Sequence, residues 1–170
     1  MILYPGEEAA SYDSIDYRKL YEEGYRGIIY DIDNTLVPHG APADDRVVAF
    51  FKDLKKIGFK TCLISNNKKE RVLPFARAVG AKAVWKAGKP SGRNYLLACR
   101  IMGTKAGNTV FVGDQIFTDV LGANLAGIRS VLVQPIHPKE EIQIVLKRYL
   151  ENVVLFCYHR HRKRIERRKQ

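Results

Sequence analysis

The sequence of 170 residues lacks the features of secreted and membrane-spanning proteins. Its three cysteines, Cys62, Cys99 and Cys157, stand far apart without a CxxC pair, so we interpret them as reduced thiols in a cytosol. The first residues have neither the basic flank nor the apolar core of a signal peptide. The longest apolar run, 153–158, is far below the roughly 20 residues that span a bilayer. The composition therefore favours a cytoplasmic protein.

Negative charge is scarce, because 18 acidic residues face 29 Lys and Arg, for a net charge of +11. Residues 159–170 hold seven of the basic residues against one Glu, which makes this segment +6. We expect a single domain at 1–158 and a basic tail at 159–170. The tail favours binding to an anionic membrane surface, with a peripheral location at the inner face of the membrane. RNA is an equally charged alternative, and a solvated end that binds no partner is the plain one.

The chain is long enough for one domain with a substantial core, and no internal repeat precedes the tail. Short β-type runs alternate with amphipathic helical patterns, which predicts a parallel sheet covered by helices on both faces. The expected fold is α/β, a three-layer α/β/α Rossmann-like arrangement around five strands. The predicted strands are 26–32, 60–64, 83–85, 109–112 and 130–133, and the predicted helices are 14–24, 44–57, 68–79, 92–102 and 118–125.

A further helical pattern follows a start signal at 138–141. Its apolar residues recur at helical spacing, which favours a last helix packed on the core. These residues are Ile142, Val145, Leu146, Tyr149, Leu150 and Val153.

Polar clusters follow four of the predicted strands. They are Asp31 with Asp33, then Ser65 to Asn67, then Lys86 to Lys89, and finally Gly113 to Gln115 with Asp119. Each cluster alone is an ordinary turn or helix start. In a parallel sheet, however, all strand carboxyl ends meet at one edge, so the four clusters are expected to form one site there.

In this order the clusters resemble the motifs of the haloacid dehalogenase-like (HAD) superfamily over residues 26–133. The run from Asp31 to Thr35 matches the first motif, Ser65 the second, Lys89 the third, and Gly113 to Asp119 the fourth. The residues around Asp31 and Asp114 resemble those of the YqeG-like branch, which is similar to phosphatidylglycerophosphate phosphatases. Gln115 departs from members with a second adjacent acid there, and we expect weaker metal affinity but intact catalysis.

The resemblance implies a Mg²⁺-dependent phosphatase with an aspartyl-phosphate intermediate. Carboxylate chemistry agrees, with Asp31 as nucleophile and Asp33 as general acid and base. Mg²⁺ prefers carboxylates, phosphate oxygens and waters, so Asp31, Asp114 and the Asp33 carbonyl are the expected ligands. The predicted phosphate-binding residues are Thr35, Ser65, Asn66 and Lys89. Asp119 is expected to orient Lys89 or, alternatively, only to begin the following helix.

The sequence has no room for the cap domain that covers the site in many members of this superfamily. Only 34 positions separate Asp31 from Ser65, and only 24 separate Ser65 from Lys89. An open site implies a large phosphomonoester such as phosphatidylglycerophosphate in a membrane, or a homo-oligomer whose neighbouring subunit covers a soluble sugar phosphate or nucleotide. An RNA-associated protein that uses the fold as scaffold is a third alternative.

Three residues near the predicted site have ordinary interpretations. Trp85 precedes the Lys89 loop and could line the entrance, although packing is the commoner role of such a tryptophan. His39 and Lys86 are interpreted as surface residues.

Overall fold

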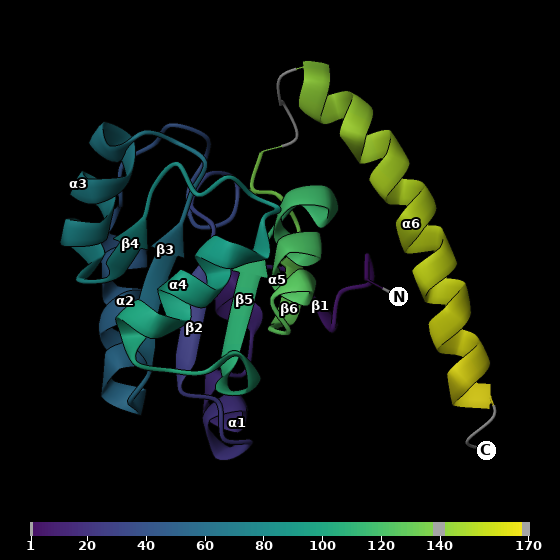
Figure 1. Cartoon of the computed structure of the whole chain (residues 1–170), viewed down its shortest axis with the longest axis horizontal. Coiled ribbons are helices and arrows are strands. Elements are labelled where there is room, and N and C mark those ends of the chain that lie inside the picture. The colour runs from purple at the N-terminus through teal and green to yellow at the C-terminus, as the bar shows by residue number, and fades with distance from the viewer. Residues whose placement is uncertain (1, 138–141, 168–170) are drawn as a thin grey trace.

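A parallel sheet of six strands forms the centre of the protein, in the order β1-β6-β5-β2-β3-β4 (Figure 1). The computed structural model describes residues 2–137 and 142–167, and the side chains of 142–148 are outside that description. All strand pairs are parallel, so the carboxyl ends share one edge, which we call the catalytic edge. The strands are β1 (Glu7–Ala9), β2 (Gly27–Tyr30), β3 (Lys60–Ile64), β4 (Lys82–Val84), β5 (Thr109–Gly113) and β6 (Arg129–Val133).

The predicted count of five strands is wrong by one. The additional strand, β1, pairs with β6 at the border of the sheet, with Glu8 opposite Leu132. It has only three residues, two of them glutamates, so it carries neither the apolar run nor the alternation that marks a strand in a sequence. Its pairing depends on a neighbour more than 120 positions away.

Helices connect the strands as the alternation predicts. The α-helices are α1 (Tyr17–Glu22), α2 (Asp45–Ile57), α3 (Lys69–Val79), α4 (Gly92–Met102), α5 (Leu121–Leu125) and α6 (Ile142–Arg167). Short 3₁₀ turns cover Tyr12–Ser14 and Ala106–Asn108. Two predicted helices differ from the structure. The first is split between the turn Tyr12–Ser14 and α1, and the helix predicted at 118–125 begins earlier as a π-helical turn, Ile116–Val120.

Helix α2 shows how local chemistry sets a boundary. The Asp44 carboxylate accepts the Val47 N–H at 2.8 Å and caps the first turn. Gly58 ends the helix in the left-handed region, at φ 111°, where a Cβ atom would be strained.

The two faces of the sheet bury alternate residues of the same strand. Ile28 and Tyr30 belong to a core shared with α1, α2 and α3, whereas Ile29 belongs to a core shared with α4 and α5. All three side chains are fully buried. The predicted three-layer α/β/α fold is therefore confirmed, with no domain inserted among residues 2–137.

Helix α6 runs along the β1 side of the sheet (Figure 1). It buries Glu151 and Tyr158, and Val154 and Leu155 pack against a small cluster beside β6. Tyr149, Leu150 and Val153 are exposed, however, so the predicted core packing of these three is wrong. They lie on the outer side of the helix, away from the buried positions. The predicted start at 138–141 and the side chains of Ile142, Val145 and Leu146 lie outside the described residues.

Within residues 2–137 and 142–167, no helix has the length and apolarity needed to cross a membrane. Cys62 and Cys99 are buried, Cys157 is exposed, and all three are free. Helix α6 continues through residue 158 to Arg167 without a break.

Candidate active site

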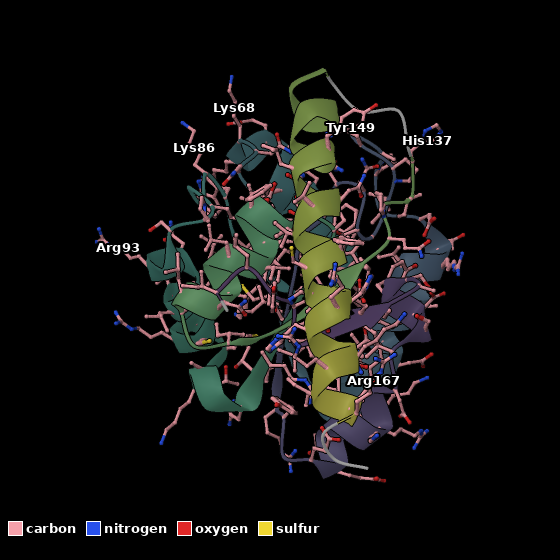
Figure 2. All side chains as sticks on the ribbon, turned by 90° about the vertical axis from the view of Figure 1, so that its right-hand side faces the viewer. Lys68, Lys86, Arg93, His137, Tyr149 and Arg167 are labelled. Carbon is pink, nitrogen blue, oxygen red and sulfur yellow. The ribbon has the colours of Figure 1, made fainter. Side chains whose placement is uncertain are left out.

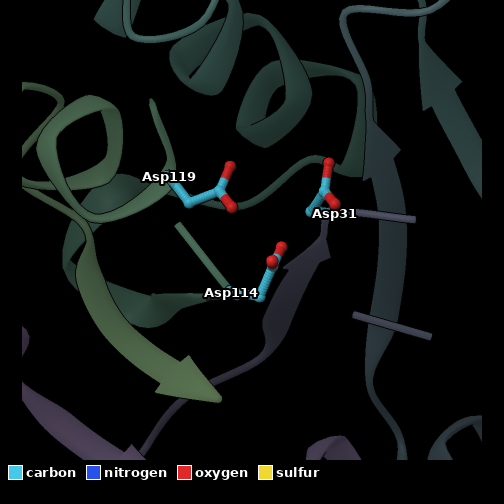
Figure 3. A group of neighbouring side chains, drawn as sticks. All are labelled: Asp31, Asp114 and Asp119. Carbon is cyan, nitrogen blue, oxygen red and sulfur yellow. The ribbon is translucent and has the colours of Figure 1, made fainter. Parts of the chain in front are cut away.

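Three aspartates converge where β2 and β5 end. Asp31 follows β2, and its N–H donates to the Val112 carbonyl at 3.0 Å, which joins the two strand ends. Asp114 follows β5, and Asp119 lies in the π-helical turn behind it. Their carboxylates point toward a common space (Figure 3), with one oxygen of each within 4.8 Å of the others. All three side chains are buried.

The ammonium group of Lys89 lies among these carboxylates. Its Nζ donates to Asp31 and to Asp119 Oδ1, the latter at 2.7 Å, and the side chain is only 6% exposed. The loop that carries Lys89 is tied to the Ser65 loop, because Asn66 Oδ1 accepts the Lys89 N–H at 2.8 Å. The first and third motifs thus meet through direct contacts.

Burial and charge alter the protonation of this cluster. Burial raises the pKa of Asp31 to about 8; the Lys89 ammonium opposes that rise, and Asp119 and Asp114 add to it. Burial by itself would lower the pKa of Lys89, but Asp119 and Asp31 outweigh it and raise that pKa above its ordinary value. Lys89 therefore stays charged, and near neutral pH the cluster binds a proton that a cation would displace.

Asp119 contacts Lys89 as the first of its two expected roles requires. Its second oxygen accepts the Gln115 N–H at 3.1 Å, so both oxygens have donors. Gly113 permits this approach, because a Cβ atom there would lie 2.6 Å from Asp119 Oδ2. Any larger residue at 113 would displace the carboxylate that holds Lys89.

Ser65 and Asn66 follow β3 at the catalytic edge. Ser65 is buried, and its Oγ accepts the Asn67 N–H at 3.1 Å. Its carbonyl accepts the Ala87 N–H at 3.0 Å, which fixes it beside the Lys89 loop. Asn66 is exposed, and its side-chain oxygen accepts the backbone N–H of Lys89.

Thr35 contacts the acidic cluster. Its hydroxyl is buried and donates to Asp114 Oδ1 at 3.1 Å. The contact fixes the orientation of the Asp114 carboxylate.

Asp33 lies in a separate group at the border of the site. One oxygen accepts the Gly40 N–H at 2.8 Å and an Arg71 N–H at 2.9 Å, and the other accepts from Asn67 Nδ2 at 2.7 Å. Arg71 also donates to the Ala41 carbonyl at 2.7 Å. Asp33 is thus anchored to the loop that follows it and to the start of α3.

Two residues of the site were not predicted from the sequence. Arg71 resembles any exposed base, although its place in the first turn of α3 opposes the helix dipole and was a usable signal. Glu151 of α6 is 4% exposed and accepts the Ile116 N–H at 2.7 Å, two residues after Asp114. Nothing local marks this acid, because its partner lies 35 positions earlier.

The donor set fits a divalent cation such as Mg²⁺. Hard cations prefer carboxylate oxygens, and three buried acids with one lysine have an excess of negative charge. Both oxygens of Asp119 accept hydrogen bonds from the protein, one from Lys89 and one from Gln115.

The three residues with ordinary interpretations lie around the site. Trp85 is 38% exposed directly after β4, and Lys69 Nζ lies 5.5 Å above its ring. Lys86 is exposed with a positive φ of 46°, and its N–H donates to the Asn67 carbonyl at 2.9 Å. His39 is exposed in the loop before α2.

The sequence matches a known enzyme family. A family model described as haloacid dehalogenase-like hydrolase matches residues 39–127. The chain belongs to this family. The predicted superfamily and the prediction of an enzyme are both confirmed.

Two curated relatives within the family are similar to this chain over most of its length. The probable phosphatase YqeG of Bacillus subtilis is 36% identical over 152 residues, which cover 89% of this chain and 88% of that protein. The chloroplastic phosphatidylglycerophosphate phosphatase 1 of Chlamydomonas reinhardtii is 27% identical over 148 residues, covering 81% of this chain but only 55% of the longer protein.

A solved structure shares the fold at low sequence identity. The cobalt-bound form of the deoxy-D-mannose-octulosonate 8-phosphate phosphatase from Haemophilus influenzae superposes with a TM-score of 0.54 at 15% identity. The match covers 68% of this chain and 70% of the other.

Proposed function

We propose that this hydrolase is a Mg²⁺-dependent phosphomonoesterase that works through an aspartyl-phosphate on Asp31. The observation that carries the proposal is the separation of two carboxylates one residue apart. Asp31 lies among Lys89, Asp114 and Asp119, whereas Asp33 is held by other partners at the border of the site. These different surroundings support attack on phosphorus by Asp31 and proton transfer by Asp33.

In the first step a carboxylate oxygen of Asp31 attacks the phosphorus and the bond to the leaving oxygen breaks. Asp33 donates its proton to that oxygen, so the alcohol leaves neutral. In the second step Asp33 removes a proton from water, whose oxygen attacks phosphorus and releases phosphate from Asp31. Each step breaks one phosphorus–oxygen bond and forms another.

The remaining polar residues stabilise the charge on the transferred group. Lys89 would neutralise the phosphoryl oxygens, with Asp119 keeping its ammonium in place, and Ser65 and Asn66 would donate hydrogen bonds to them. Asp31, Asp114 and the Asp33 carbonyl would hold Mg²⁺, with Thr35 orienting Asp114. When bound, the ion supplies positive charge that reduces repulsion between an anionic nucleophile and an anionic substrate.

The substrate we favour is phosphatidylglycerophosphate or a similar lipid phosphomonoester. The relative from Chlamydomonas reinhardtii carries that activity in its name, although this chain spans about half of its length. The segment from Asp31 to Ser65 holds only α2 and β3 besides loops, and that from Ser65 to Lys89 holds only α3 and β4, so no cap restricts the site to small molecules. The basic residues of 159–167 would attract an anionic membrane.

The decisive test measures Mg²⁺-dependent phosphate release from phosphatidylglycerophosphate in vesicles, from sugar phosphates and nucleotides, and from p-nitrophenyl phosphate. Wild type should release phosphate from the lipid, and Asp31→Asn should not. If wild type releases none from any substrate, the proposal is wrong. Turnover of soluble metabolites alone would favour the homo-oligomeric alternative, and salt-dependent RNA binding without turnover would favour the scaffold alternative.

Metal dependence has its own test through Thr35→Val, which keeps the shape and removes the hydroxyl on Asp114 Oδ1. We expect an apparent Mg²⁺ affinity roughly 10-fold to 100-fold lower, as found for partners that orient metal ligands. Thr61→Val is the matched control, because Thr61 lies near the start of β3, away from the acidic cluster, and is only partly buried. Equal affinities in both variants would contradict the assigned metal site.

A further inference from the structure

Exposed apolar side chains lie on both sides of the site. Trp85 follows β4 and is 38% exposed, and Ile136, three residues after β6, is 42% exposed. In the sheet, β4 and β6 lie on opposite sides of β2, the strand that leads to Asp31. The Ile136 N–H donates to the Asn34 carbonyl at 3.0 Å, which places Ile136 against the first motif.

The first half of α6 adds to this apolar border. Tyr149, Leu150 and Val153 are 69%, 58% and 62% exposed. Helix α6 begins beyond the catalytic edge, at the top of the view, and descends along the side of the sheet (Figure 1). In Figure 2, Tyr149 lies at the same end of the molecule as Lys68, Lys86 and His137.

The charge near these apolar residues is cationic. Lys68 is exposed in the loop after Ser65, and Lys86 is exposed directly after Trp85. Lys69 Nζ lies over the Trp85 ring. Apolar side chains among lysines suit the boundary between lipid head groups and acyl chains. A second copy of the same chain is disfavoured as the occupant, because each copy carries a net charge of +11 and would present these lysines to the other.

We infer that the catalytic edge is the face that docks on an anionic lipid bilayer. Its apolar contacts are Trp85, Ile136, Tyr149 and Leu150, and Lys68 and Lys86 meet the lipid phosphates. This inference rests on the proposed function, since a capless site brought onto the head groups can take a phosphomonoester without extracting the lipid.

The basic end of α6 has a secondary part in this docking. Ile165 lines a hollow with Arg129, the first residue of β6, at the edge opposite the site. Arg160 and Arg164 lie 10 and 14 residues along α6 from Leu150, which is about 15 Å and 21 Å at 1.5 Å per residue and exceeds the screening length of about 8 Å at physiological salt. The basic residues of 159–167 therefore do not share one flat contact with the catalytic edge, and salt screens most of their attraction to a membrane docked there.

Trp85 reports the contact directly, because it is the only tryptophan of the chain. The probe is vesicles of phosphatidylcholine with and without phosphatidylglycerol, which contain no phosphomonoester. We expect a blue shift of the Trp85 emission and cosedimentation with the anionic vesicles alone. Ile136→Glu should weaken binding about 10-fold. The matched control is Ile101→Glu, which is 40% exposed near the end of α4, at the opposite edge, and should bind as wild type does.

A second set of variants separates the two basic regions at physiological salt. Lys68→Gln with Lys86→Gln should reduce vesicle binding by roughly fivefold per lysine. Arg160→Gln with Arg164→Gln should reduce it less. Leu150→Glu on α6 repeats the apolar test if Ile136→Glu does not fold.

Absence of the blue shift with anionic vesicles would overturn the inference. So would equal binding of Ile136→Glu (or Leu150→Glu) and Ile101→Glu, a larger loss from the arginine pair than from the lysine pair, or binding to RNA in place of vesicles. Because the vesicles hold no substrate, binding does not depend on turnover. A blue shift without phosphate release from any ester would reject the proposed function and leave the docking face standing.

Discussion

The carboxylates of Asp31 and Asp33 belong to two different regions of the site. The inner region, around Asp31, is a buried group of three acids and one lysine built from the ends of β2 and β5, the turn after β5 and the loop after β4. The outer region, around Asp33, is a more exposed group whose cation is Arg71, 22% exposed. The difference shows that a strand end can keep two acids that are one residue apart in separate environments, as the two proposed roles require.

The largest predicted effect tests whether the two roles are separate. Asp31→Asn removes the proposed nucleophile, so we expect activity to fall by more than about 10³-fold with every substrate. Asp33→Asn should lower it about 10²-fold to 10⁴-fold with an alkyl phosphate. The loss should shrink with p-nitrophenyl phosphate, whose leaving group needs no proton. Steady-state rates with both esters measure the loss of activity in each variant. If both variants were equally sensitive to the leaving group, the two carboxylates would not have separate roles.

Arg71 tests whether the outer region depends on its own cation. Arg71→Met frees Asp33 from one of its donors, and we expect the turnover number to fall about 10-fold, as for lost positioning contacts in metal sites. The stabilisation of the protein by Mg²⁺, seen as a shift in melting temperature, should stay unchanged because the inner region is intact. Arg77→Met, on an exposed turn of the same helix, is the control. A loss of Mg²⁺ stabilisation in Arg71→Met would show that the regions are coupled.

Glu151 tests whether α6 supports the inner region. Glu151→Leu leaves the buried Ile116 N–H without this acceptor, so we expect a loss of about 1–3 kcal/mol in unfolding free energy. Glu151→Gln keeps an acceptor oxygen and should recover most of it, and Glu166→Gln, at an exposed position, should change nothing.

The same variants distinguish positioning from plain stability. If Glu151 holds the turn that follows Asp114, Glu151→Leu should also weaken the apparent Mg²⁺ affinity by about 10-fold, measured by the Mg²⁺-dependent melting shift. A protein that is less stable but has the wild-type Mg²⁺ affinity would show that the contact is only structural.

A further prediction is a dependence of stability on pH in the metal-free protein. The pKa of Asp31 is about 8 in the folded state and about 4 in the unfolded chain, so the folded state binds the extra proton. The stability that this proton contributes is complete below pH 4 and is lost as pH rises toward 8. Denaturant unfolding in a chelator should show the decline, and Asp31→Asn should flatten it. A wild-type protein without the decline would contradict the raised pKa.

Much of the site could be predicted because its residues follow strands that the local pattern reveals. The apolar runs before Asp31 and Asp114 mark buried parallel strands, and parallel strands bring their ends to one edge whatever the intervening sequence. The contacts of Lys89 with Asp31 and Asp119 follow from that rule. The number of strands could not be predicted in this way, because β1 has no sequence pattern of its own and depends on its pairing with β6.

The sequence by itself determined the α/β alternation, the shared edge and the family, because each depends on periodicity or on residue types at short spacing. Only the tertiary structure decided that Arg71 holds Asp33, that Glu151 supports the turn after Asp114, and that Tyr149 and Leu150 face outward. The physical reason is distance along the chain. A helical pattern shows that a helix forms, but the side it buries depends on neighbours folded against it from more than 30 positions away.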